Sequence, residues 1–496
     1  MGIVKKQAYK NTIISYMGMV IGYGNVLLYA KYLFVGQYGL FSLLQILAVL
    51  YSLIAGLGVP SIIIKYFPFF KTEDRKHNGF FFLVARLALL SFAVVTILYI
   101  IAKPVFVDIY KDKDSALFMQ YFYILIPLSA FVVAFNVFEA TGKVIYNTIY
   151  SGFLNQLLLK LLTTVDIFLY GWHVISFQQF ILIYVAINGL IAVMLLISLI
   201  ATGKFKLSFK TSRIEDVKNA QIVYYGLFAL VSSSVYILWQ KADIAMLSAM
   251  KGLEVTGAYN FYSQVAIVIS IPAQALSRTT YQIIADSWKS KNMQPIGEVY
   301  SKTSIVQMVF GCLLFVGILV NKYNLFNIIH NKDYTTHFEF FIAIGLGFLV
   351  DITGGLNTFI MSSSHKYRLT TFMVIVSSIL CFGLTYIMIG WWGGLGAAIA
   401  YLIVITLFNF ATWFYIKTRF KLQPFTYKHL LVILIAAISF LVGKYLWTIP
   451  NTYADLVVRS IITGTIYMVL IYLLHISGDV NEKIDGTFQK ALKFIK

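Results

Sequence analysis

The chain has 496 residues, of which 59% are hydrophobic and only 12% are charged, and its formal net charge is +19. Soluble domains usually carry about a quarter charged residues, so this composition excludes an ordinary soluble protein. The basic residues recur between apolar runs instead of forming one patch, which argues against a nucleic-acid partner. Both cysteines, Cys312 and Cys381, lie inside apolar runs, so we expect no disulfide framework.

Apolar runs long enough to cross a bilayer follow one another along the whole chain. A spanning helix needs roughly 20 residues. The runs predict fourteen spans, at 12–30, 39–59, 80–102, 117–138, 149–171, 179–201, 224–247, 257–277, 303–321, 339–361, 369–389, 395–416, 429–447 and 456–476. The first span follows three lysines and has no small-residue cleavage site, so we expect it to be retained. The prediction is an all-α polytopic membrane protein.

The basic residues also predict the orientation of the chain. An even number of spans puts both termini on one side of the membrane. If that side is the cytoplasm, 27 of the 39 Lys and Arg residues fall on cytoplasmic segments. The opposite orientation violates the positive-inside rule, so we expect cytoplasmic N- and C-termini.

A weak internal repeat divides the chain. A shift of 218 residues aligns Gly39 in "QYGLFS" with Gly257 in "VTGAYN" and places Asn25 opposite Asp243. Many transporters are built from two six-helix repeats. We predict an N-terminal six-helix lobe at 1–201, a basic cytoplasmic linker at 202–222, a C-terminal six-helix lobe at 223–416, two additional helices at 417–476 and a cytoplasmic tail at 477–496.

Basic residues inside the spans are candidates for function because charge is costly in hydrocarbon. Arg86 lies near the cytoplasmic face, where it either contacts phosphate or snorkels to the headgroups. Lys160 lies near mid-span and cannot snorkel easily, which favours a functional role. Arg278 follows Pro272 at an inner span end, so either a substrate contact or the positive-inside rule explains it. Lys444 and Arg459 lie towards outer span ends, where interface anchoring is the better interpretation.

Four acidic residues are candidates for coupling or gating: Asp166, Asp243, Asp351 and Glu139. Asp166 follows Lys160 by six residues and therefore lies on a different helix face, which argues against an ion pair. Lys241 is similarly a poor partner for Asp243, since residues two apart do not face each other. Either a cavity-facing carboxylate or a hydrated helix end explains Asp243. Asp351 precedes two glycines and either binds a cation or satisfies the backbone of a broken helix.

Several motifs resemble, in order, those of the polysaccharide flippases of the MATE/MOP exporter superfamily. They are "GQYGLFSLL", "GLGVPSIIIKYFP", "DIAMLSAMKGLEVTGAYNFYSQVAIVISIPAQALSRTTYQIIAD", "GGLNTFIMSSSHKYR" and "GGLGAAIAYLIVITLFNF". The resemblance covers nearly the whole chain. It implies two six-helix bundles around a central cavity, two extra C-terminal helices and alternating access. It also implies a bacterial inner (plasma) membrane location and a polyprenyl-diphosphate-linked oligosaccharide as substrate, carried for surface polysaccharide (O-antigen, lipopolysaccharide or capsule) biosynthesis.

The candidates above fit the parts of a site that the resemblance implies. A cationic cavity for the diphosphate draws on Arg86, Lys160, Arg278 and Asn25, and Tyr23 and Tyr236 are candidates for sugar contact. Hinges are expected near Gly39, Pro127, Gly257 and Pro272. Partners are expected to be the lipid-linked oligosaccharide, membrane lipids and polysaccharide polymerase or assembly proteins. No cofactor is expected, while coupling to protons, Na⁺ or the membrane potential stays open.

Three alternatives remain. A peptidoglycan lipid-precursor flippase also has fourteen spans, and the sequence barely distinguishes it from a polysaccharide flippase. A multidrug or cation antiporter is expected to have twelve spans and an acidic cavity. A membrane glycan polymerase or glycosyltransferase is expected to carry paired chemistry in a large outer loop, whereas all predicted outer loops are short. The seven histidines are dispersed and give no metal-ligand spacing, so we expect neither an enzyme nor a metal site.

Overall fold

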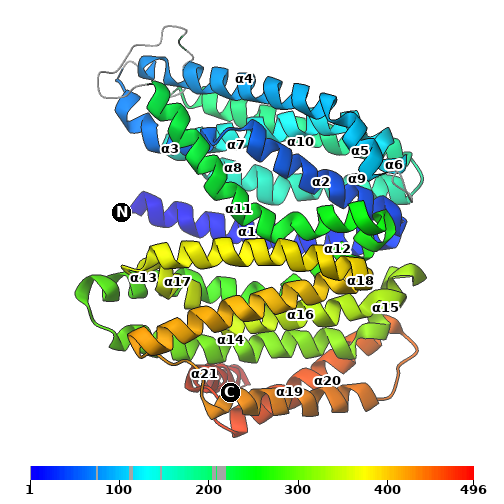
Figure 1. The fold of residues 1–496 in the computed structure, drawn as a ribbon. Helices are drawn as coiled ribbons and strands as arrows, with labels where there is room; N and C mark the ends of the chain where they lie inside the picture. The colour runs from blue at the N-terminus through cyan, green and yellow to red at the C-terminus, as the bar shows by residue number, and fades with distance from the viewer. Residues whose placement is uncertain are drawn as a thin grey trace. The chain divides into compact units, whose positions relative to one another are not determined.

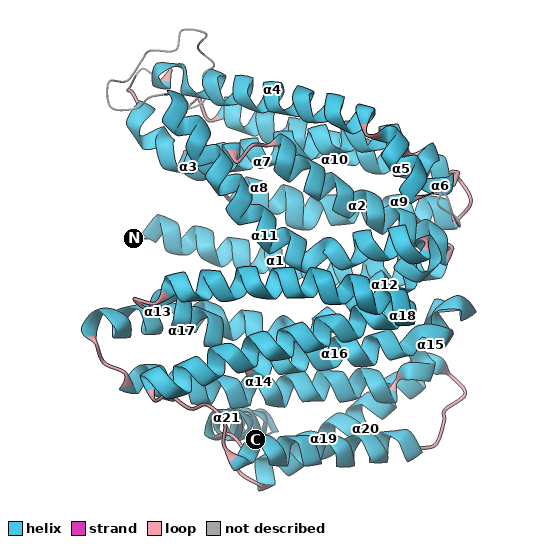
Figure 2. Ribbon diagram, in the orientation of Figure 1, coloured by secondary structure: helices cyan, strands magenta, loops and turns pink. Residues whose placement is uncertain are grey.

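The computed structural model describes residues 2–73, 76–110, 116–145, 148–203, 208 and 219–495. Within these ranges, the side chains of 2–10, 116, 219, 232, 235, 236, 238–240, 275, 277–279 and 487–495 are not described. Most of the predicted linker at 202–222 therefore lies outside the described residues. The described residues form helices and turns without a β-strand, as Figure 2 shows. Contacts divide the chain into two compact units, Met1–Asn260 (unit 1) and Phe261–Lys496 (unit 2).

The first twelve helices, coloured blue to green in Figure 1, belong to unit 1, except that α12 continues past Asn260 into unit 2. They are α1 (Gly2–Tyr32), α2 (Val35–Ala55), α3 (Val59–Phe70), α4 (Phe80–Ile101), α5 (Lys103–Ile109), α6 (Ala116–Gln120), α7 (Leu125–Val144), α8 (Ile149–Gly152), α9 (Leu159–Gly171), α10 (Phe177–Ala201), α11 (Asn219–Lys251) and α12 (Leu253–Ala266). One core cluster of buried side chains joins α7, α10 and the segment Phe153–Leu158, and partly buried leucines of α9 pack against it. The helix α11 contacts α2 and α3, which places it in this unit.

Unit 2 contains the remaining helices. They are α13 (Ile271–Ser290), α14 (Gln294–Val320), α15 (Lys322–Ile329), α16 (Phe338–Thr353), α17 (Asn357–Ser363), α18 (Tyr367–Tyr415), α19 (Tyr427–Tyr445), α20 (Thr452–Leu473) and α21 (Gly478–Ile495). Buried side chains of α14, α19 and α20, including Met308, Val432 and Tyr467, form one apolar cluster. The two additional C-terminal helices therefore pack directly against α14.

The helices match the predicted number of spans. Eleven are long and apolar enough to cross a membrane, among the residues that the structure describes. The longest of these, α18, contains two predicted spans, which meet at Gly393. The φ of Gly393 is +58°, a conformation that favours glycine. The helices α11 and α12–α13 cover the two remaining predicted spans, so about fourteen transmembrane helices are present.

Several predicted spans are interrupted, and two of the interruptions lie after residue 256. The span predicted at 339–361 breaks between α16 and α17, where Gly355 has a φ of +63°. The span predicted at 257–277 contains a 3₁₀ turn, Ile267–Ser270, which ends two residues before Pro272 in the first turn of α13. Proline lacks the amide hydrogen that would continue the helical ladder, so the interruption falls where the sequence allows it.

Candidate functional site

A polar cluster joins α1 and α9 inside unit 1. The Lys160 ammonium group donates to the carbonyl oxygen of Gly18 at 2.9 Å. The Asn25 amide donates to the carbonyl oxygen of Lys160 at 3.0 Å, and the Thr164 hydroxyl donates to Asn25 Oδ1 at 2.6 Å. The predicted substrate residues Lys160 and Asn25 therefore meet, although they lie 135 positions apart in the chain.

The local backbone explains how this lysine is placed. A π-helical segment, Phe153–Leu158, directly precedes α9. Its Gln156 carbonyl lies so close to Gly18 that a Cβ on this glycine would be 1.9 Å away. At Gly22 a Cβ would lie 2.9 Å from Lys160 Nζ. The two glycines thus let α1 approach both the π segment and the lysine, and π segments often occur at functional positions.

Asp166 lies nearly two turns further along α9 and is almost completely buried, with 1% of its surface exposed. Neither carboxylate oxygen has a hydrogen-bond partner among the described residues. No salt bridge within the described part of the chain joins it to Lys160, as the six-residue spacing predicts. A buried carboxylate in this state costs free energy unless a proton or cation neutralises it.

The helices α2 and α12 cross at the two glycines that the repeat aligns. A Cβ on Gly39 would lie 1.9 Å from the carbonyl oxygen of Leu253, and a Cβ on Gly257 would lie 2.1 Å from that of Val35. These two approaches are reciprocal, because Val35 and Leu253 are also related by the 218-residue shift. The crossing is therefore a local two-fold contact between the two copies of the repeat.

Hydrogen bonds extend the same crossing. The Asn260 amide donates to Ser42 Oγ at 2.7 Å, and these residues are again 218 positions apart. It also donates to the Tyr38 hydroxyl at 3.1 Å. Sequence reasoning missed this pair because neither residue is charged. Applying the 218-residue shift to the polar residues of α2 would have found it.

Asp243 is half-buried near the end of α11. Its Oδ2 accepts a hydrogen bond from the Tyr259 hydroxyl at 2.7 Å, and its Oδ1 accepts from the backbone amide of Ile244. No salt bridge connects it to Lys241 among the described residues, which agrees with the two-residue spacing. Asp243 is therefore tied to α12 beside the glycine crossing.

The remaining unit 1 candidates do not join these clusters. Arg86 is exposed on α4, and Tyr23 is half-buried on α1. Glu139 forms an i,i+4 salt bridge of 3.2 Å with Lys143. Pro127 lies in the first turn of α7. The side chains of Tyr236, on α11, and of Arg278, on α13 in unit 2, lie outside the described residues.

Unit 2 contains a second polar cluster, around the break between α16 and α17. The Asn409 amide donates to Asp351 Oδ1 at 3.1 Å, while Asn409 Oδ1 accepts from Asn357 at 3.4 Å. The Tyr300 hydroxyl donates to Asn357 Oδ1. Nearby, Ser304 Oγ donates to the carbonyl oxygen of Thr353, which the helix break leaves available. Asp351 therefore belongs to a network that spans α14, α16, α17 and α18.

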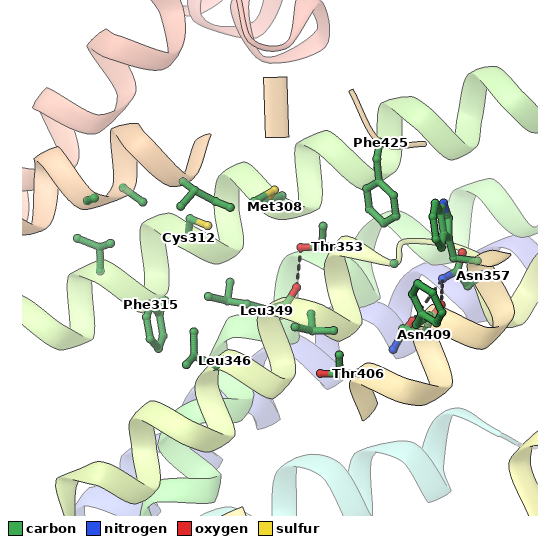
Figure 3. A pocket seen from close by; sticks show the side chains of 18 of the residues that line it. Met308, Cys312, Phe315, Leu346, Leu349, Thr353, Asn357, Thr406, Asn409 and Phe425 are labelled. Carbon is green, nitrogen blue, oxygen red and sulfur yellow. Dashed lines mark hydrogen bonds between the residues drawn. The ribbon is translucent and has the colours of Figure 1, made fainter. Parts of the chain in front are cut away.

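An apolar groove of about 620 Å³ borders this network in unit 2. Its walls come from α14, α16, α18 and α19, including Cys312, Leu349 and Phe410. Figure 3 shows Met308, Cys312 and Phe315 along the apolar part, with Asn357 and Asn409 at one end. Both asparagines line the groove and belong to the polar network, so the groove joins an apolar surface to a polar end.

One predicted role is wrong. Arg459 does not anchor at the interface, because it is 6% exposed and forms a buried pair with Asp455, with Nε to Oδ2 at 3.0 Å. Position near a span end suggested anchoring, but the i,i+4 acid turns the side chain inward. Lys444 is exposed, with its ammonium group 5.6 Å from the Tyr445 ring centre, and its anchoring at the interface stays a prediction.

Comparison with known proteins supports the fold. No protein-family model matches the sequence, and no curated protein matches it. Among solved structures, the lipid II flippase MurJ in an inward closed conformation is similar, with a TM-score of 0.75, 14% identity, and coverage of 94% of this chain and 98% of that one.

Two multidrug-type structures are also similar. An inward-facing multidrug resistance MATE family transporter of the MOP superfamily gives a TM-score of 0.62 at 13% identity, covering 84% of this chain and 98% of the other. A mutant of the Vibrio cholerae MATE transporter VcmN gives 0.55 at 10% identity, covering 85% and 98%. The chain therefore has the fold of the MATE/MOP superfamily transporters.

Proposed function

We propose that the protein is a flippase that moves a polyprenyl-diphosphate-linked oligosaccharide across the bacterial plasma membrane by alternating access, for surface polysaccharide biosynthesis. The observation that carries the proposal is the fold. Similarity to a lipid II flippase extends over 94% of the chain, whereas the similarity to the two multidrug-type transporters covers 84% and 85%. We infer that the substrate combines a lipid tail with a polar headgroup.

A peptidoglycan lipid precursor is the second candidate substrate. The TM-score of 0.75 to the lipid II flippase favours it directly. The motifs quoted above favour a surface polysaccharide repeat unit instead. Both substrates share a polyprenyl tail and a diphosphate, so the residues that meet these two parts are expected to serve either substrate.

Lys160, the groove and Asp166 are each suited to one requirement of such transport. Lys160 supplies a half-buried positive charge suited to a diphosphate, since charge-assisted hydrogen bonds strengthen away from water. The groove in unit 2 supplies an apolar surface suited to part of the polyprenyl tail. Coupling to protons or Na⁺ is assigned to Asp166, whose buried carboxylate requires neutralisation.

Deleting the gene in its host tests the proposed function. Intact lipid-linked repeat units should accumulate in the inner leaflet, and surface polysaccharide should be lost. Accumulation of the peptidoglycan precursor with cell lysis would establish the second candidate instead. Normal amounts of both lipid-linked glycans on both faces would reject lipid-linked sugar as the substrate. Transport in proteoliposomes, with and without imposed proton and Na⁺ gradients, would then identify the coupling ion.

Replacing Lys160 with glutamine is expected to slow transport about tenfold or more, the size of effect that follows the loss of one charge-assisted hydrogen bond. Glutamine can still donate to the Gly18 carbonyl, so folding should be preserved. Transport of a fluorescent lipid-linked oligosaccharide in proteoliposomes measures the effect. Lys31→Gln, on the exposed end of α1, is the matched control. Equal rates for the two variants would contradict a substrate role for Lys160.

Replacing Ala437 with tryptophan is expected to fill part of the groove and to reduce transport severalfold, because the bulky ring occupies the space assigned to the tail. Ile438→Trp is the control, since Ile438 is an exposed neighbour on α19 that does not line the groove. Polyprenyl diphosphate should also bind more weakly to the purified Ala437 variant than to the purified Ile438 variant. Unchanged binding to the Ala437 variant would remove the groove from the substrate path.

A further inference from the structure

A second cavity, of about 940 Å³, lies in unit 2 and shares no lining residue with the polar cluster of that unit. Its walls come from α15, from the segment between α15 and α16, and from the start of α20, which all lie at one end of the unit (Figure 1). The charge rule puts this end on the outer side of the membrane. We call it the outer pocket. Within the part of the chain that the structure describes, none of the residues predicted to contact substrate lines it.

The outer pocket carries several hydrogen-bond donors on an otherwise largely apolar surface. Asn331 Oδ1 accepts from the backbone amide of Asp333, and Asn451 Oδ1 accepts from the amides of Tyr453 and Ala454. Both side-chain oxygens are thereby occupied, while the two NH₂ groups remain to donate. Lys322 and Lys332 add positive charge, and no carboxylate among the described residues lines the pocket. Such a lining suits a ligand with acceptor oxygens and negative charge.

Aromatic rings flank these donors. Tyr323 and Tyr453 line the pocket and are 75% and 64% exposed. An aromatic face beside amide donors suits a sugar, because the ring contacts the apolar face of a pyranose while the donors meet its hydroxyl oxygens. Tyr and Trp are suited to such contacts since they are rigid and amphipathic.

A buried network beneath the pocket fixes its walls. Asn324, the neighbour of Tyr323, donates to Asp455 Oδ2 at 2.6 Å. Arg459 binds both oxygens of the same carboxylate and donates to the carbonyl oxygens of Gly443 and Trp447. The network joins α15 to α19 and α20. Its central residue, Asp455, follows Tyr453 by two positions. Walls held in this way lose little conformational freedom when a ligand binds.

We propose that the outer pocket binds an acidic saccharide on the outer face of unit 2. The pocket would receive a uronic-acid or phosphate-bearing sugar after translocation. Its link to the translocated headgroup rests on the proposed function, whereas binding itself does not. An anionic lipid headgroup shares the negative charge but offers no pyranose face to the tyrosines, so the experiment separates the two sources.

The test measures binding of tetragalacturonic acid to the full-length protein in a detergent without sugar, by isothermal titration calorimetry. Tetragalacturonic acid should bind at least about tenfold more tightly than neutral maltotetraose. Lys332→Gln and Tyr453→Ala should each weaken binding about tenfold, the size expected for one lost charged or stacking contact. Lys444→Gln and Tyr445→Ala are matched controls, since both residues are exposed outside the pocket, and they should bind normally.

Three results would overturn the proposal. They are absence of saccharide binding, equal loss in the pocket and control variants, or competition by phosphatidylglycerol in mixed micelles with no preference for the saccharide. Transport in proteoliposomes keeps the two proposals apart. Transport without tetragalacturonic acid binding would retain the flippase and reject the outer pocket. Binding without transport of any lipid-linked saccharide would retain the pocket and reject the flippase.

Discussion

Gly39→Ala is expected to lower the thermal stability of the protein clearly, whereas Gly24→Ala should leave it unchanged or raise it. A Cβ on Gly39 would lie 1.9 Å from the carbonyl oxygen of Leu253, so α2 and α12 would have to separate. Overpacking of this kind typically costs about 1–3 kcal/mol. Gly24 has no described atom within 4 Å of its Cβ position, and alanine is the better helix former there. Thermal unfolding in detergent measures both variants.

The reciprocal geometry of the crossing also predicts the effect of the equivalent substitution at Gly257. Gly257→Ala should destabilise the protein by a similar amount, because its Cβ would meet the Val35 carbonyl in the reciprocal position. The double variant should cost less than the sum of the two single variants, since either methyl group already moves the helices apart. Strict additivity would mean that the two glycines act at separate contacts. Equal unfolding temperatures for Gly39→Ala and Gly24→Ala would contradict the close crossing altogether.

Hydropathy predicted the helices well because a span must be apolar over a fixed length, whatever it packs against. The repeat was visible as well, since only glycine allows the close approach at Gly39 and Gly257. Its alignment also paired Asn25 with Asp243, but their surroundings differ. Asn25 bonds to the backbone of α9, whereas Asp243 accepts from Tyr259 on α12.

The polar contacts of unit 2 were harder to predict. Asn357 and Asn409 are uncharged amides in apolar runs, so nothing in composition separates them from other polar residues in spans. Their pairing with each other depends on the break at Gly355 and on how α16, α17 and α18 meet. The glycines of "TGGL" (353–356) and the proline of "SIP" (270–272) indicate where the helices break. Hydropathy alone does not, because a broken helix and a straight one have the same apolar length.

At Arg459, an acidic residue one helical turn away determines the surroundings of the side chain more than its position near a span end does. Its place near an outer span end suggested contact with headgroups. Asp455 precedes it by four residues, a spacing at which opposite charges meet on one helix face. Once paired, the guanidinium can turn inward, where the carbonyl oxygens of Gly443 and Trp447 accept its other hydrogens.

Arg459→Met is accordingly expected to destabilise unit 2 strongly. Removing one partner of a buried ion pair typically costs about 3–5 kcal/mol, because the other charge stays buried without compensation. Here the Asp455 carboxylate would retain only Asn324 and the Ile449 amide as donors among the described residues. Lys444→Met removes a positive charge from an exposed site on the neighbouring helix and should have little effect on the unfolding temperature.

The double variant Asp455→Leu, Arg459→Met separates charge from packing. It should recover part of the lost stability, because no isolated charge remains. Recovery should be incomplete, since the Gly443 and Trp447 carbonyls and the Ile449 amide lose these partners in the same step. The Asn324 amide keeps only its hydrogen bond to Asn321. If Arg459→Met unfolded at the same temperature as Lys444→Met, the pair would contribute nothing to stability. The outer pocket would then lack the rigid support that we assign to its walls, and saccharide binding should be insensitive to the same substitution.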